Sequence, residues 1–310
     1  MKAIMYHYIR PEDKDYPYFK FLHLNDFKKQ LDFFQDNFTI VHPGKLTELL
    51  NNGADENNIV LTFDDGLKDH YRYVLPELLK MGISGIFYVS TGMYKTKKLL
   101  DVHRLHMLLG KYGGETIYAY LLTLIVPGML TDASIKEFRE LTYKTQENDA
   151  ATLAVKRILN YFISYNFRES VMDKLMNSFL PGEAEFYNEF YLTPGEIKEM
   201  QDAGMVIGSH TVNHPLLSKL SVEDQSFEIY DSFNFLEETT NGLLFKTFCF
   251  PYGGEHSFTK ETERLLQDAN CVYSFNVEAR DITKQDMLKR PQALPRYDCN
   301  IFPHGRVWEG

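Results

Sequence analysis

The sequence predicts an α/β fold built on a parallel sheet or barrel, with a mostly helical insertion near the middle of the chain. Short apolar runs alternate with segments of helical periodicity in residues 1–95 and again from Thr193 onward. This alternation is typical of consecutive βα units, whose strands pair in parallel. Between about residues 91 and 192 the alternation stops and helical patterns take over. At 310 residues and 44% hydrophobic content, the chain is long and apolar enough to build a large core.

The first part of the chain is expected to alternate strands with helices. A helix capped by Asn25 has its apolar side chains at helical spacing, namely Phe27, Leu31, Phe34 and Phe38. Further helices are expected at residues 43–52 and 67–81. The expected strands are residues 3–9, 38–41, 58–63 and 83–90.

The middle of the chain is expected to be a helical insertion at about residues 96–190. Its apolar residues recur every three to four positions within five segments, residues 101–111, 115–126, 134–142, 149–162 and 167–179. Pro-Gly pairs at residues 127–128 and 181–182 interrupt these segments. A segment of this length between two βα units is expected at the mouth of a barrel, where it would influence substrate choice or dimer contact.

The strand and helix alternation resumes at Thr193. This residue is expected to cap a helix, because Pro194 follows at the first turn and Glu196 stands at the third position. A helix to residue 203, a strand to 209, a helix at 222–239, a strand at 246–250, a helix at 259–270 and a strand at 272–276 follow.

Composition narrows the classes of partner and compartment. The formal net charge of −10 disfavours nucleic acid and anionic membranes as partners, because both are negatively charged. Cys249, Cys271 and Cys299 show no CxxC spacing, so reduced, buried thiols are expected. Met1 leads straight into an apolar run without the features of a signal peptide, and no apolar run approaches the roughly 18 residues of a membrane span. A cytoplasmic location is therefore expected, and the oligomeric state stays open.

The strand at residues 58–63 ends in two adjacent acids and a glycine, Asp64, Asp65 and Gly66. Neighbouring carboxylates repel each other, and both stay ionised only if a cation or a proton joins them. A metal bound to one acid, with the other free to take protons, would resolve this conflict. The alternative is a strand followed by an ordinary Asp-Gly turn.

A second apolar run, residues 204–209, leads into His210 and His214, which stand just before a proline. A tight turn can point both imidazoles at one ion, although paired histidines also occur as ordinary surface residues. One aspartate and two histidines form a set that leaves positions open for water and substrate. Such a set suits zinc or another first-row divalent ion.

The two motifs in this order, Thr62-Phe63-Asp64-Asp65-Gly66 and His210-Thr211-Val212-Asn213-His214-Pro215, resemble the polysaccharide deacetylase family. This family is also called the NodB-homology family or carbohydrate esterase family four. The resemblance covers about residues 1–95 and 192–300 and implies a deformed (β/α)7-type barrel. It also implies metal-assisted removal of an acetyl group from a sugar, by one catalytic domain spanning residues 1–310 around the insertion.

The resemblance assigns roles to individual residues. It implies that Asp65, His210 and His214 bind one divalent metal, with zinc expected and cobalt, nickel or manganese as alternatives. Asp64 is implied as the general base. Tyr252, in the run Phe248-Cys249-Phe250-Pro251-Tyr252-Gly253, matches the position whose backbone N–H helps to hold the oxyanion.

The sequence departs from the family pattern at the partner of the catalytic aspartate. Relatives often carry an arginine at the position of Cys249, where it pairs with that aspartate. Arg296, expected at the end of a late strand, is the candidate substitute. Asp281 is a weaker candidate for a supporting acid.

A second departure concerns the general acid. Relatives commonly place it in a late Leu-x-x-His stretch, which is missing here. In circularly permuted members, such as the deacetylases of biofilm poly-N-acetylglucosamine, a Tyr-His pair on an early strand supplies it. Tyr6-His7 fits that position, so His7, on the strand expected at residues 3–9, is the candidate acid.

These observations favour a metal-dependent deacetylase acting on an N-acetylated sugar or polysaccharide precursor, free, nucleotide-linked or lipid-linked. Two alternatives stay open at this point. One is a hydrolase of another C–N bond, of the cyclic amide type. The other is a carbohydrate-binding protein on the same scaffold without catalysis.

Overall fold

The computed structural model describes residues 1–52, 55–143 and 148–306. It divides into two compact units. The first comprises residues 1–12, 21–96 and 188–306, and the second comprises residues 13–20 and 97–187. The boundaries of the second unit lie close to those expected for the insertion. Its placement at the mouth of a barrel stays a prediction.

The first unit is organised around a parallel sheet. Its strands are β1 (Lys2–Tyr6), β5 (Asn58–Phe63), β6 (Gly85–Val89), β7 (Val206–Ser209), β8 (Thr247–Cys249), β9 (Tyr273–Phe275) and β10 (Tyr297–Asp298). They pair in the order β10-β1-β5-β6-β7-β8-β9, and β4 (Thr39–Ile40) pairs with the start of β5. All of these pairs are parallel.

A short segment joins the two ends of this sheet. Leu294 forms a parallel bridge to Phe275 of β9. Three residues later, Tyr297 pairs with Ile4 of β1. Residues 294–298 therefore complete the ring, and the predicted deformed (β/α)7-type barrel is confirmed.

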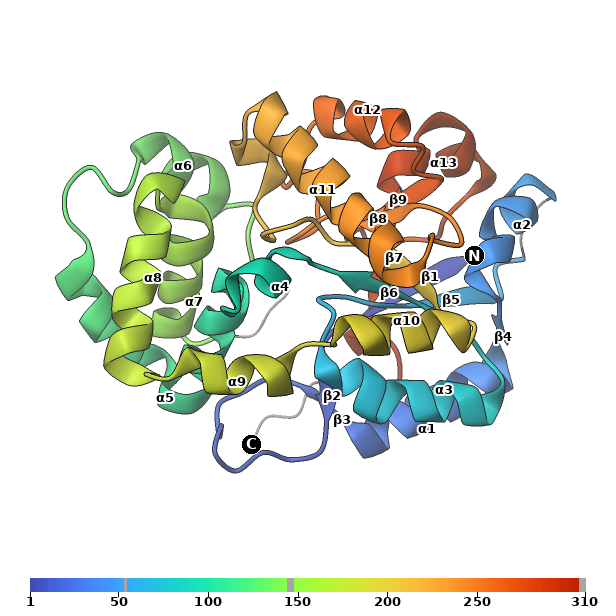
Figure 1. Ribbon diagram of the computed structural model, residues 1–310, viewed down its shortest axis with the longest axis horizontal. Helices are drawn as coiled ribbons and strands as arrows, with labels where there is room; N and C mark the ends of the chain where they lie inside the picture. The colour runs from blue at the N-terminus through green and yellow to red at the C-terminus, as the bar shows by residue number, and fades with distance from the viewer. Residues whose placement is uncertain (53–54, 144–147, 307–310) are drawn as a thin grey trace. The chain divides into compact units, whose positions relative to one another are not determined.

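Helices surround the sheet of the first unit, as Figure 1 shows for α1, α3, α10, α11 and α12. The helices of this unit are α1 (Leu24–Asn37), α2 (Leu46–Asn52), α3 (Leu75–Met81), α4 (Gly92–Thr96), α10 (Pro194–Asp202), α11 (Val222–Thr240), α12 (Lys260–Asp268) and α13 (Lys284–Lys289). A separate parallel pair, β2 (Ile9–Arg10) with β3 (Leu22–His23), follows β1. Among the described residues, no helix is both long enough and apolar enough to cross a membrane.

Alternate residues of the strands build the core of the first unit. One buried cluster draws side chains from consecutive strands of the ring, including Ala3, Val60, Ile86, Val206 and Phe275. Residues of a strand alternate between its two faces, so this set marks one face of the sheet. Each fully buried aliphatic or aromatic side chain of this kind contributes about 1.5–3 kcal/mol. The three cysteines are buried free thiols, as predicted.

The start of α10 follows the sequence prediction. The Thr193 hydroxyl accepts a hydrogen bond from the Glu196 backbone N–H at 3.2 Å, and a Glu196 carboxylate oxygen accepts one from the Thr193 N–H at 2.7 Å. This reciprocal capping box satisfies two N–H groups that the helix itself leaves without partners.

Several predicted boundaries are wrong. The cap of α1 is His23, whose Nδ1 accepts from the Asn25 N–H at 3.1 Å, so Asn25 lies inside the helix. β1 ends at Tyr6, which places His7 beyond the strand. Arg296 precedes β10 and does not stand at the end of a strand.

The second unit is mostly helical, as predicted. It contains α5 (Asp101–Leu124), α6 (Asp132–Arg139), α7 (Ala150–Arg157), α8 (Tyr165–Phe179) and most of α9 (Glu183–Phe190), which was not predicted. The two helices expected at 101–111 and 115–126 form α5, which breaks at Gly113, where φ is 75°. Arg104 donates to both carboxylate oxygens of Glu183 at 2.7 Å and so ties α5 to α9.

The helix expected at residues 67–81 begins as a π-helix, His70–Val74, before α3. His70 is fully buried, and its ring lies 5.7 Å from the rings of Phe63 and Phe87. Burial lowers the pKa of His70 to about 4. The neutral imidazole is therefore the form that the fold accommodates.

His70 is expected to make the stability of the fold depend on pH. Its folded-state pKa of about 4 lies below the ordinary value of 6.5, so the unfolded chain takes up the proton first as the pH falls. The contribution of neutral His70 to the free energy of unfolding is complete above about pH 6.5. It is lost, by up to about 3 kcal/mol, as the pH falls toward 4. Urea unfolding at about pH 7 and about pH 4.5 should show a smaller loss for His70→Phe than for the unchanged protein. Equal losses in both proteins would contradict this assignment.

Candidate active site

The polar residues singled out in the sequence gather at the carboxyl edge of the barrel strands. Asp64 and Asp65 follow β5, His210 follows β7, and Tyr252 lies three residues beyond β8. His7 comes directly after β1. Parallel strands direct their carboxyl ends to one edge, so segments far apart in the sequence meet there.

Three buried side chains form a candidate metal site. Asp65 Oδ1 lies 3.4 Å from His210 Nε2 and 3.5 Å from His214 Nε2. One ligand atom from each of the three residues lies within 4.8 Å of the other two. The two imidazole rings stand at 77° to each other with centroids 4.8 Å apart.

The spacing of these donors fits a first-row divalent ion. Bonds of about 2.0–2.2 Å at tetrahedral angles place two ligand atoms about 3.3–3.5 Å apart. The separations of 3.4 and 3.5 Å from Asp65 Oδ1 agree with that value. One carboxylate and two imidazoles leave a fourth position for water or substrate.

His210 is oriented by the strand next to its own. Its Nδ1 lies 2.7 Å from the backbone oxygen of Cys249. A carbonyl oxygen can only accept, so Nδ1 donates to it and Nε2 is the ring nitrogen left to bind a metal. Histidine ligands of metals are commonly oriented in this way.

The turn between the two histidines is held by Glu228, which no sequence pattern singled out. This buried carboxylate on α11 accepts from the backbone N–H groups of Val212 and Asn213, each at 2.8 Å. It also accepts from the Asn213 side chain at 2.7 Å. The turn packs tightly on Gly92, where an added Cβ would lie 2.5 Å from Asn213 Oδ1.

Asp64 is paired with Arg296 in the interior of the protein. Arg296 Nη1 donates to Asp64 Oδ1 and Nη2 to Oδ2, each at 2.8 Å. Arg296 is completely buried and Asp64 is 2% exposed. Burial by itself would raise the pKa of Asp64, but the charge and hydrogen bonds of Arg296 lower this pKa to about 2. Asp64 is therefore an ionised carboxylate beside the candidate metal site.

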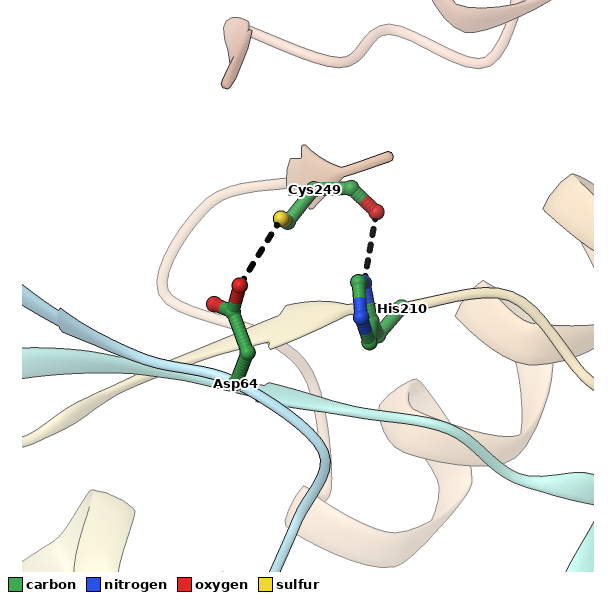
Figure 2. A group of neighbouring side chains, drawn as sticks. All are labelled: Asp64, His210 and Cys249. Carbon is green, nitrogen blue, oxygen red and sulfur yellow. Dashed lines mark hydrogen bonds between the residues drawn. The ribbon is translucent and has the colours of Figure 1, made fainter. Parts of the chain in front are cut away.

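Cys249 completes the surroundings of Asp64. Figure 2 shows its thiol directed at Asp64 and its carbonyl directed at His210. The Sγ–Oδ2 distance to Asp64 is 3.3 Å, and Arg296 Nη2 donates to Sγ at 2.7 Å. Burial raises the pKa of the thiol, which keeps it protonated and able to donate.

Asp64, His210 and Cys249 also bring ligand atoms within 4.8 Å of one another. A cation bound there would lie against the guanidinium of Arg296, which already contacts both Asp64 and Cys249. Like charges at such distances disfavour one another. The set formed by Asp65, His210 and His214 is therefore the better metal site of the two.

His7 faces Asp64 from the end of β1. Its Nε2 lies 3.9 Å from Asp64 Oδ2, and its side chain is 41% exposed. The ring is thus next to the carboxylate and open to solvent. A group that exchanges protons with a substrate requires both properties.

Tyr252 lies against the second histidine. The rings of His214 and Tyr252 meet edge to face with centroids 5.0 Å apart. The backbone of Tyr252 has a φ of 64°, and Gly253 follows with a φ of 59°. These left-handed conformations form the sharp turn that follows Pro251.

Asp281 is not part of this site, contrary to the weaker sequence hypothesis. It accepts from Lys2 Nζ at 2.8 Å and from the Tyr297 hydroxyl at 2.7 Å. Lys2 is the first residue of β1, whereas the candidate site lies beyond the last residues of the strands. Asp281 therefore forms an ion pair with Lys2 at the amino end of β1.

Comparison with known proteins finds a family match for part of the chain. The polysaccharide deacetylase family model matches residues 152–273, a range that contains His210, His214 and Tyr252. No curated protein matches the chain significantly.

Three solved structures share the fold across nearly the whole chain. The deacetylase PplD of Streptococcus pyogenes, in complex with acetate, has a TM-score of 0.59 at 17% identity, with 96% of this chain and 91% of that chain covered. IcaB from Ammonifex degensii has a TM-score of 0.53 at 17% identity, with 96% and 90% covered. The polysaccharide deacetylase BC0361 from Bacillus cereus has a TM-score of 0.53 at 16% identity, with 96% and 64% covered.

At these identities the structural likeness concerns the fold alone, so the expected kinship with circularly permuted members stays a prediction. The family match spans the second histidine motif and the turn after β8. The barrel is the one that deacetylases of this family adopt. The chain therefore carries a polysaccharide deacetylase match over residues 152–273 and shares the fold of solved deacetylases.

Proposed function

We propose that this protein is a metal-dependent hydrolase that removes an acetyl group from an N-acetylated sugar or polysaccharide precursor. The observation that carries the proposal is a buried three-ligand set beside an ionised carboxylate. Asp65, His210 and His214 bring their ligand atoms together, and Asp64 lies next to them with its charge fixed by Arg296. The match of residues 152–273 to the polysaccharide deacetylase family supports deacetylation of an acetylated sugar.

In this proposal Asp65, His210 and His214 hold the metal. A bound divalent ion supplies a Lewis acid that polarises the amide carbonyl and lowers the pKa of water. Asp64 accepts a proton from the attacking water as general base. Arg296 holds both carboxylate oxygens of Asp64, so the base is kept in one orientation.

The leaving nitrogen needs a proton as the C–N bond breaks, because an amide anion is a very poor leaving group. His7 is the proposed donor. Its partly exposed ring lies 3.9 Å from Asp64, the buried partner of Arg296. The water proton taken by Asp64 and the proton given by His7 balance the reaction, which yields a free amine and acetate.

Tyr252 is proposed to stabilise the oxyanion that forms when water adds to the carbonyl. Tyr252 lies in a turn with a φ of 64°, and its ring packs on His214 of the candidate metal site. A backbone N–H fixed in such a turn stabilises developing negative charge without reorganising.

The proposed substrates are amino sugars or oligosaccharides that carry an N-acetyl group, including nucleotide-linked or lipid-linked precursors. Zinc is the expected metal, with cobalt, nickel or manganese as alternatives for the same donor set. The solved relative from Streptococcus pyogenes is a deacetylase in complex with acetate. Acetate is the product expected for this chain.

Metal binding is the first test. Asp65→Asn, His210→Ala and His214→Ala are each expected to abolish stoichiometric binding of a divalent metal, because each removes one of the three ligands. Elemental analysis after dialysis measures the metal, and circular dichroism confirms the fold. His304→Ala is the matched control, since His304 is exposed. A full equivalent of metal in all three ligand variants would show that the ion is bound elsewhere.

Activity is tested by the release of acetate. The metal-loaded protein is expected to release acetate from N-acetylated amino sugars or their oligomers and to lose this activity with a chelator, because the metal polarises the carbonyl. Zinc, cobalt, nickel and manganese are then added back one at a time. An O-acetylated sugar and a cyclic amide complete the substrate panel. Release that is insensitive to the chelator, or hydrolysis of the cyclic amide alone, would contradict the proposal.

The general acid is tested by His7→Ala. Turnover is expected to fall by roughly 10²–10⁴-fold with metal content unchanged, because the leaving nitrogen loses its proton donor. Steady-state kinetics gives the turnover, and elemental analysis gives the metal content. Near-normal turnover in His7→Ala would move the acid to another residue.

A further inference from the structure

We infer that His70 is a positioning residue that fixes the main chain at His7 and thereby aims the proton donor of the reaction. This inference rests on the proposed function of His7. His70 comes four residues after the acidic motif, on the π-helix that precedes α3. No sequence signal connects it to His7.

The main chain leaves the barrel at His7. The last contact of β1 with the segment that follows β5 is the hydrogen bond from the Asp64 N–H to the Tyr6 oxygen, at 2.9 Å. The next carbonyl, that of His7, lies 2.9 Å from His70 Nε2. The His70 side chain therefore provides the next hydrogen bond to this segment after the backbone hydrogen bonds of the strand end.

The chemistry of the two groups fixes the tautomer of His70. A carbonyl oxygen accepts and never donates, so Nε2 of His70 carries the proton. Its Nδ1 is then a bare acceptor, and this atom is buried without a hydrogen-bond partner among the described residues. The ring packs against both Phe63 and Phe87, with centroids 5.7 Å away, in surroundings that favour the neutral form.

An imidazole is a poor filler for this apolar space. A phenylalanine would bury no polar atom there, whereas His70 leaves one nitrogen unsatisfied. The hydrogen bond to the His7 carbonyl is the polar interaction that distinguishes histidine from phenylalanine at this position. The hydrogen bond that holds the His7 main chain therefore explains why histidine, and not phenylalanine, occupies position 70.

The residue before His70 holds the same segment at a second point. Asp69 Oδ2 accepts from Arg10 Nε at 2.8 Å, and the Arg10 guanidinium lies 5.4 Å from the ring of Tyr8. The consecutive residues Asp69 and His70 therefore bind Arg10 and the His7 carbonyl, respectively. His70 and the residues after it form a π-helix, in which each hydrogen bond spans one more residue than in an α-helix. Such turns often occur at functional sites.

A displacement of about 1 Å at a reacting group can lower turnover by about 10²-fold. Release of the His7 carbonyl would allow such a displacement. The ring of His7 is partly exposed, and its Nε2 lies 3.9 Å from Asp64 Oδ2. The backbone bond to His70 is thus a principal restraint on where this ring points.

The kinetic test compares two replacements of His70 in two backgrounds. His70→Phe is expected to lower turnover by roughly 10–10²-fold with KM and metal content unchanged. His70→Gln should recover part of that loss, because its amide nitrogen can donate to the same carbonyl. In the His7→Ala background, His70→Phe should have no further effect, because the two changes act through one proton transfer.

A loss of turnover of less than twofold in folded His70→Phe would overturn the inference. An equal loss in the presence and in the absence of His7 would do so as well, since it would indicate a structural role alone. His70→Gln that is no better than His70→Phe would contradict the donor role.

A spectroscopic test separates this inference from the proposed function. Nitrogen-15 NMR of histidine-labelled, metal-free protein should show His70 as the neutral tautomer protonated at Nε2 at about pH 6 to 8. Protonation at Nδ1 instead would overturn the inference even if the enzyme is active. Absence of acetate release from every acetylated sugar, with the expected tautomer present, would count against the proposed function.

Discussion

The ion pair between Arg296 and Asp64 is the interaction on which the barrel and its site both depend. Arg296 lies in the segment that joins β9 to β1, and it donates to Asp64, to the Thr62 hydroxyl at 3.0 Å and to the Asn276 backbone oxygen at 3.3 Å. One side chain therefore connects β5, the end of β9 and the closing segment. Removing one partner of such a buried pair typically destabilises a fold by about 3–5 kcal/mol, because the other charge stays buried alone. The same Arg296–Asp64 pair consequently helps to close the ring of strands and keeps the proposed base ionised.

The position of Cys249 explains how the arginine can come from this segment. Relatives that resemble this chain often carry an arginine on the strand where Cys249 stands. Here a small thiol occupies that place, 3.3 Å from Asp64, and the guanidinium of Arg296 reaches the same carboxylate with Nη2 2.7 Å from the sulfur. Two guanidinium groups on one carboxylate in a buried space would repel each other. The replacement at position 249 and the arginine at 296 are therefore best understood together, as two routes to the same ionised aspartate.

Local chemistry in the sequence was sufficient for some features and insufficient for others. The capping box at Thr193 and the apolar run before Asp64 are short-range patterns, and both were predicted correctly. His23 displaced Asn25 as the cap of α1 because a ring nitrogen accepts the same backbone N–H, a use of histidine that propensities do not favour. Asp281 was misjudged because its partner Lys2 is remote in sequence. Glu228 and His70 went unnoticed because each bonds backbone groups of another element, 15–16 and 63 residues away, which no local pattern indicates. Position 296 could be proposed only from the family resemblance and the missing arginine.

Left-handed backbone recurs where the proposed ligands must converge. Of the nine described non-glycine residues with a positive φ, four lie at the candidate site: Asp65 (83°), Thr211 (68°), His214 (54°) and Tyr252 (64°). Conformations of this kind cost about 1–3 kcal/mol each and persist only where the surroundings determine them. The surroundings here are specific: Glu228 holds the turn after His210, and the Thr211 hydroxyl accepts from the His214 N–H at 2.9 Å. A regular strand end would point Asp65 and His214 away from a common centre, so the strain is the means by which separate strands supply one donor set. The rigid barrel, closed through Arg296, is what makes that strain sustainable.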